Sequence, residues 1–207
     1  MASSGFKLIC SKEQMYLRKN ADQNVFCLEF TCNNPAIDLR NLLQFDTLFR
    51  LLTDLNKDIV ESIRVCHHCS ENDVEVLYLF NTAGANNNDL GISKRYMYVN
   101  KRIEQRINST TGQQEIVFTS KSVNCPTAHE LQSAGYELIE TPLSVQKFIA
   151  NDPHTLQIIH MFRMNLQTEL PVYLENSLGI LIKRIYHRFK TFVEAIPPST
   201  TTPAASF

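Results

Sequence analysis

The stretch Asp73-Val-Glu-Val-Leu-Tyr-Leu-Phe80 decides the fold class of this chain. It consists largely of β-formers and is too short for a typical helix, so it predicts a strand. Three similar runs follow it, at 92–99, 103–107 and 115–120, after a polar loop at 82–89 and with a turn at 108–112. Short β-forming runs separated by turn residues predict a meander of antiparallel strands.

The segment before this meander has apolar residues at a helical period. Apolar side chains recur mostly at steps of three or four from Ile37 to Ile63. This spacing predicts an amphipathic helical region over 37–63, as one long helix or as two with breaks at Phe45-Asp46 and Asn56-Lys57. Short strands are expected before it, at 6–10 and 25–31.

The last third of the chain predicts a short helix at 127–133, strands at 136–139, 143–149, 156–164 and 171–175, and a final amphipathic helix. We therefore expect one α+β domain over 1–196. Its antiparallel sheet, open or closed into a barrel, packs against the 37–63 region and against a helix at 177–194. The Ser/Thr/Pro/Ala-rich tail at 197–207 should be disordered.

The overall charge excludes several classes of function. The sequence has 20 basic and 21 acidic residues, so no global charge attracts it to nucleic acid or to acidic membranes. It contains 6 glycines in 207 residues, and it shows neither a Walker-type loop nor a dinucleotide fingerprint. With no apolar run of about 18 residues and no apolar segment at 1–8, we expect an intracellular protein with no membrane partner.

The sharpest cluster of reactive residues is Cys66-His67-His68-Cys69. Two thiolates at this spacing can chelate zinc, with Cys27 and Cys32 as a second pair. Positions 27 and 32 of one strand point to opposite faces, however, which argues against that pairing. We favour free cysteines that pack as small core hydrophobes, with the histidines in a helix-to-strand turn, and whether Cys66 and Cys69 bind zinc stays open.

Catalytic signals are sparse. The six histidines are scattered, no serine sits in a nucleophile-elbow frame, and His160 alone could face a pocket, although a barrel-lining or surface position is the favoured interpretation. A metal-dependent phosphohydrolase would gather carboxylates at alternate strand positions, and only Asp73 and Glu75 have that spacing. The other strand glutamates are Glu29, Glu104, Glu115 and Glu175. We assign no catalytic, cofactor or metal residues, and we lean toward a protein that is not an enzyme.

Two basic clusters remain as candidate binding patches. One lies in the meander and comprises Lys94, Arg95, Lys101, Arg102 and Arg106. The other, on the final helix, comprises Lys183, Arg184, His187, Arg188 and Lys190, and its members Lys183, Arg184, Arg188 and Lys190 are the candidate binding patch. A solvated helix face is the alternative interpretation, because the helix dipole favours cations near a C-terminus.

The order of elements from Thr127 onward supplies a resemblance. A short helix runs into Gly135-Tyr136-Glu-Leu138, strands follow, and Val172-Tyr-Leu-Glu175 leads into the closing helix. Over about 127–196 this is similar to the CYTH-type β-barrel of triphosphate-tunnel enzymes and of subunit eighteen of the Mediator head module. The enzymes carry paired glutamates on their first strand, whereas the run at 25–30 here has only Glu29. The resemblance therefore implies a non-enzymatic barrel.

These observations lead to three functional hypotheses. The first is a non-enzymatic scaffold subunit of a nuclear, transcription-related assembly, in which a partner helix or peptide binds the sheet or the apolar helices and no cofactor is used. The second is a metal-dependent triphosphate-tunnel phosphohydrolase or cyclase. The third is a viral or structural protein that binds nucleic acid through the basic helix.

Overall fold

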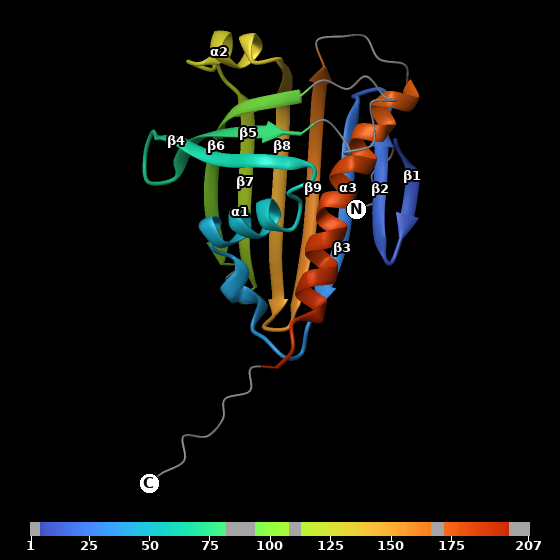
Figure 1. Cartoon of the computed structure of the whole chain (residues 1–207). Helices are drawn as coiled ribbons and strands as arrows, with labels where there is room; N and C mark the ends of the chain where they lie inside the picture. Colours follow the sequence, from blue (N-terminus) through green and yellow to red (C-terminus); the bar gives the residue numbers. More distant parts are fainter. Residues whose placement is uncertain (1–4, 82–93, 108–112, 167–171, 199–207) are drawn as a thin grey trace.

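The structure is a computed structural model of the chain and describes residues 5–81, 94–107, 113–166 and 172–198 (Figure 1). The strands are β1 (Phe6–Lys12), β2 (Met15–Asn20), β3 (Val25–Asn33), β4 (Val60–His68), β5 (Asp73–Phe80), β6 (Lys94–Ile107), β7 (Gln114–Ser122), β8 (Tyr136–Asp152) and β9 (Thr155–Leu166). The helices are the 3-10 turn η1 (Leu39–Leu42) and the α-helices α1 (Phe45–Asp54), α2 (Ala128–Ser133) and α3 (Val172–Ala195).

The described strands form one sheet in the order β1-β2-β3-β9-β8-β7-β6-β5-β4. Neighbours in this order are antiparallel, and the starts of β6 and β8 add a short parallel pairing. Within the described residues β1 and β4 are the two edges of the sheet, so it does not close. The predicted α+β class with an antiparallel sheet and a C-terminal helix is confirmed, in its open form.

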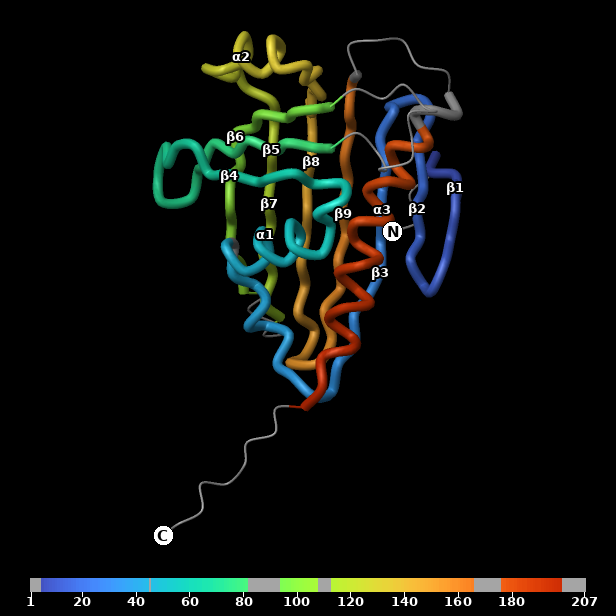
Figure 2. Tube along the Cα trace, in the orientation of Figure 1, coloured from blue at the N-terminus to red at the C-terminus, as the bar shows by residue number. Residues whose placement is uncertain are grey.

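The sheet bends so strongly that β4 and β5 cross in front of β7 and β8 (Figure 1). The tube view shows α1 and α3 on the same side, with α3 running along β9 and β3 (Figure 2). Aromatic side chains fill much of the core: Phe26 stacks on Phe162 with ring centroids 5.2 Å apart, and Phe118 meets Phe148 edge-on at 5.6 Å. A bent sheet that faces a long helix creates an interior between them.

Contacts at both ends hold α3 to the sheet. Near its start, Gly179 lies so close to β3 that a Cβ atom there would stand 2.7 Å from the ring of Phe26. At its end, the buried Asn34 amide donates to the carbonyl oxygens of Val193 (2.7 Å) and Ile196 (3.0 Å), which satisfies groups that a helix terminus otherwise leaves unpaired. Asn34, the residue after β3, therefore ties this part of the chain to the end of α3.

Several predicted boundaries change. Helix α1 begins at Phe45 and ends before Asn56, at the two predicted breaks, but 60–63 is strand β4 and not helix. The polar run Asn100-Lys-Arg102 does not end a strand, because β6 continues through it. Pro142 likewise lies inside β8. Strand β8 has a register shift between Glu140 and Leu143, where Pro142 cannot donate a ladder hydrogen bond. Strand β2 was not predicted.

Residues 172–175 begin α3 and do not form a strand. The predicted loop at 82–89, the turn at 108–112, residue 171 and most of the 197–207 tail lie outside the described residues. No helix among the described residues is both long enough and apolar enough to span a membrane.

Candidate functional site

The interior between the bent sheet and α3 holds a cavity of about 570 Å³. This volume is within the roughly 300–1,000 Å³ of typical small-molecule sites. Residues from α1, β4 to β9 and α3 line the cavity. Most of the lining side chains are apolar: Leu52, Val60, Ile63, Phe80, Met97, Val99, Ile139, Phe162, Met164, Leu178, Leu181, Ile182 and Ile185.

Polar side chains gather on one part of this wall because of the strand register. Lys101 on β6 lies opposite Ser120 on β7, which in turn lies opposite Ser144 on β8. Gln146 follows Ser144 by two residues along β8 and lies opposite His160 on β9. Directly paired residues and residues two apart share a face of a sheet, so all five point toward the cavity that they line.

Lys101 is buried in this polar group, with 2% of its surface exposed. Its ammonium donates to the Tyr78 hydroxyl (3.2 Å) and to Oε1 of Gln146 (3.3 Å). It also lies 4.7 Å from the ring centroid of Phe49 and 4.8 Å from that of Phe118. Burial disfavours the charged form and lowers the pKa of Lys101 from 10.5 to about 7.

His160 is buried beside this group, with 5% of its surface exposed. Burial, and secondly the charge of Lys101, lower the pKa of the imidazole from 6.5 to about 3, so the ring is neutral at pH 7. Its Nε2 lies 3.0 Å from the Ser144 hydroxyl and 3.4 Å from the amide nitrogen of Gln146. Its Nδ1 is buried and has no hydrogen-bond partner among the described residues.

A charged pair lines another part of the cavity. Arg95 on β6 and Glu137 on β8 form an ion pair of 2.5 Å, and the Arg95 side chain is 12% exposed. Together with Lys101, the described lining therefore carries two cations and one carboxylate. His160 is neutral at pH 7 and adds no charge to this part of the lining.

The structure places His160 in a pocket, which is one of the positions that the sequence allowed. Lys101, which the sequence grouped with the other cations of the meander, lines the same pocket. Arg95 of that meander cluster also lines the cavity. The remaining three members form separate surface ion pairs: Lys94 with Glu61, Arg102 with Asp73, and Arg106 with Glu104. The sequence did not identify Lys101 as an interior residue, because the polar run around it is typical of a break between strands. The usable signal is its alternation with Val99 and Ile103, which marks an inward position.

The candidate patch on α3 divides between two sides of the helix. Lys183 and Lys190 are mostly buried, where Lys183 Nζ lies 3.6 Å from Cys10 Sγ and Lys190 donates to the Thr31 carbonyl oxygen (2.6 Å). Arg188 pairs with Asp58 through both guanidinium nitrogens, and Arg184 lies 3.9 Å from the same carboxylate. A binding role for these four residues stays a prediction.

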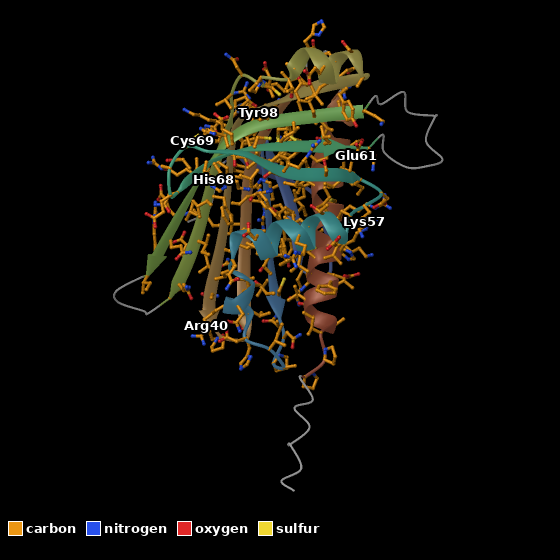
Figure 3. All side chains as sticks on the ribbon, turned by 60° about the vertical axis from the view of Figure 1, so that its left-hand side comes forward. Arg40, Lys57, Glu61, His68, Cys69 and Tyr98 are labelled. Carbon is orange, nitrogen blue, oxygen red and sulfur yellow. The ribbon has the colours of Figure 1, made fainter. Side chains whose placement is uncertain are left out.

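The cysteine and histidine cluster lies at the end of β4, away from the cavity. Figure 3 shows His68 and Cys69 at the opposite end of β4 from Glu61. Cys66 and Cys69 are exposed, so the interpretation of these two as core residues is wrong. Cys27 and Cys32 do face opposite sides of β3, and five strands separate them from β4 in the sheet. Among the described residues no three potential metal ligands come together.

The strand glutamates do not converge either. Glu29 pairs with Arg18 at 3.0 Å, Glu75 accepts from the Tyr98 hydroxyl at 2.7 Å, and Glu115 lies 3.5 Å from Lys147. Glu104 pairs with Arg106, and the side chain of Glu175 lies outside the described residues. None of the four described glutamates lines the cavity.

No family model and no curated protein matches the sequence. Solved structures do share the fold. Human STARD10 superposes with a TM-score of 0.72 at 12% identity, covering 93% of this chain and 74% of its own. The human StarD13 (DLC2) lipid transfer and protein localization domain has a TM-score of 0.66 at 15% identity, covering 93% and 90%. Human StAR-related lipid transfer protein 5 has a TM-score of 0.63 at 13% identity, covering 93% and 86%.

These comparisons correct the resemblance drawn from the sequence. The fold is that of StAR-related lipid transfer domains, and the likeness of 127–196 to a CYTH-type barrel or to the Mediator subunit is wrong. This chain has the short helix, the Gly135-Tyr136 pair, the strands and the closing helix in that order and yet has a different fold, so the order alone does not identify the barrel. The hypotheses of a transcription scaffold with a protein partner, of a triphosphate-tunnel enzyme and of a nucleic-acid-binding protein are withdrawn. The intracellular location stays untested.

Proposed function

We propose that this chain binds a lipid-sized, largely apolar molecule in the cavity between the sheet and α3. The observation that carries the proposal is the cavity itself: about 570 Å³, lined mainly by aliphatic and aromatic side chains. Burying the apolar surface of a ligand there contributes about 25 cal/mol per Å² before the entropic cost of binding is subtracted. The solved structures with this fold include proteins named for lipid transfer, which supports the same assignment.

Filling the cavity with a larger side chain tests this function. Leu181 on α3 lines the cavity, whereas Ile180, the residue before it, is 47% exposed. Leu181→Trp should weaken binding of Nile red, a neutral dye whose emission changes in apolar surroundings, by about tenfold or more, because the indole occupies ligand space. Ile180→Trp adds the same group outside the cavity and should leave the dissociation constant unchanged.

Thermal unfolding of both variants checks that each is folded, and Met97→Phe provides a second, smaller obstruction from β6. Equal dye binding by wild type, Leu181→Trp and Met97→Phe would show that ligand does not enter this cavity. Absence of dye binding by the wild type would contradict the proposal outright.

A further inference from the structure

We propose that Cys10 and Lys183 form a peroxide-sensitive modification site, in which a hydroperoxide oxidises the thiol and the lysine amine then bonds to the sulfur. The product is a covalent link between β1, an edge strand of the sheet, and α3 (Figure 1). In the unmodified protein Lys183 Nζ lies 3.6 Å from Cys10 Sγ. The proposal is independent of the cavity and its ligand, because neither residue lines the cavity.

An irregularity in β1 turns Cys10 toward α3. The register of β1 against β2 shifts between Leu8 and Cys10, which leaves Ile9 as an extra residue and pairs Cys10 with Leu17. Leu17 is buried under α3, where a Cβ atom at Gly179 would stand 3.2 Å from its side chain. Directly paired residues share a face of the sheet, so Cys10 faces α3 as well.

The helix brings Lys183 to the same place. Lys183 follows Gly179 by four residues, so the two lie on one side of α3. One turn farther along, Nε2 of His187 lies 2.7 Å from a carboxylate oxygen of Glu13, which belongs to the turn between β1 and β2. Contacts on both sides of Lys183 therefore hold α3 against this hairpin and keep the amine beside the thiol.

The surroundings of the pair favour its reaction. Lys183 is 8% exposed, and the Cys10 sulfur is the hydrogen-bond partner that the described residues offer its amine. The ammonium stabilises negative charge that develops on the sulfur as the thiol reacts, which promotes its oxidation. Cys10 is only partly buried and lies on an edge strand, so a molecule as small as hydrogen peroxide can reach it.

The other cysteines are placed too far from Cys10 to form a disulfide with it. Cys27 points to the opposite face of β3 from Leu28, the residue that pairs with Leu17. Cys32 shares the face of Leu28 but lies four residues, roughly 13 Å, farther along the strand. The rest lie at the far edge of the sheet or just before α2: Cys66, Cys69 and Cys125. An oxidised Cys10 therefore meets the amine of Lys183 before a second thiol.

The reaction needs no reagent besides the peroxide. Hydrogen peroxide transfers one oxygen to the Cys10 thiol, which gives a sulfenic acid and one water. Lys183 releases its ammonium proton to solvent, and the nitrogen lone pair attacks the sulfur. The sulfenic hydroxyl leaves with a proton from the nitrogen as a second water, and an S–N bond, a sulfenamide, remains. The sulfur is oxidised and the peroxide reduced, and the starting N–S distance of 3.6 Å is close to the about 3–3.5 Å of reacting atoms.

Peptide mass spectrometry of the purified wild type tests the site. After treatment with hydrogen peroxide, a protease digest should contain the Cys10 and Lys183 peptides joined to each other, with a mass lower by two hydrogens than their sum. Dithiothreitol should separate them again, because a thiol reduces the S–N bond. The link closes a long loop of the chain, so the treated protein should unfold at a temperature higher by about 5 °C or more than the untreated protein.

Lys183→Arg separates the two roles of the lysine, because it keeps a positive charge beside the sulfur and removes the nucleophilic amine. This variant should accumulate a sulfenic acid at Cys10, detected by its adduct with dimedone, and should give no joined peptides. The control variant is Lys121→Met, which removes a lysine from an exposed position of β7 and should form the link as the wild type does.

Three results would overturn the proposal. One is a wild type whose Cys10 stays a thiol, or becomes a sulfinic acid, without joined peptides. Another is a joined pair that carries an additional oxygen, which would be an N–O–S bridge in place of the S–N bond. The third is a link at Cys10 that persists in Lys183→Arg. The first two are measured on the wild type and so do not depend on how a variant folds, and none of the three affects the dye-binding test of the cavity.

Discussion

At the scale of single residues, Lys101 should make the stability of the empty protein depend on pH. Its pKa is about 7 when folded and 10.5 in its ordinary state, so the unfolded chain binds more protons between these values. The free energy of unfolding should therefore rise by about 1.5 kcal/mol from pH 7 to pH 8.5. Denaturant titrations at both pH values measure this change.

Among the described residues, the other titratable groups on this polar part of the wall do not ionise in this window. Burial raises the pKa of Tyr78 and Tyr186 well above 10, and His160 is neutral above about pH 3. Lys101→Met should therefore remove most of the rise, whereas Lys121→Met should retain it. A wild-type stability that is flat or falls between pH 7 and 8.5 would show that Lys101 keeps an ordinary pKa.

At the scale of elements, the close approach of α3 to β3 requires a residue without a side chain at position 179. Alanine favours a helix over glycine by about 1 kcal/mol, but a methyl group at Gly179 would stand 2.7 Å from the Phe26 ring, which stacks on Phe162. Overpacking typically costs about 1–3 kcal/mol. Gly179→Ala should thus destabilise the protein by about 1 kcal/mol in chemical denaturation.

Gly135 provides the matched control for this prediction, because a Cβ atom at its position would have no neighbour within 4 Å. Its φ of 85° nevertheless strains any other residue, so Gly135→Ala should destabilise through the backbone alone and leave α3 in place. Aromatic signals of Phe26 in NMR spectra should shift in Gly179→Ala and not in Gly135→Ala. A Gly179→Ala protein as stable as the wild type, with unshifted Phe26 signals, would refute the close contact.

The sequence predicts elements well where local pattern decides them and poorly where tertiary contacts do. The strand at 73–80 and the ends of α1 follow from local periodicity and breaking residues. Strand β6 does not, because its continuity through Lys101 depends on pairing with both β5 and β7. In the same way 172–175 has β-forming composition, yet it begins a helix whose position is set by packing on β3.

At the scale of the whole molecule, the site is a property of the assembled sheet. His160 could be suspected from its place between Ile158 and Phe162, but its neighbours Ser144 and Gln146 reach it only through the β8–β9 register. No local motif encodes a cavity whose lining comes from eight elements. The barrel hypothesis therefore fails only at the level of the whole fold, which is similar to solved StAR-related folds and has a cavity between its sheet and α3.

The central claim is that one ligand occupies this cavity, and native mass spectrometry tests it most directly. Purified wild type and Ile180→Trp, mixed with Nile red and sprayed from a detergent-free solution, should each carry one molecule of the dye per chain. Leu181→Trp should appear mainly as the bare chain, because its indole occupies the ligand space. A wild type that carries no dye, or equal occupancy in Leu181→Trp and Ile180→Trp, would contradict the claim.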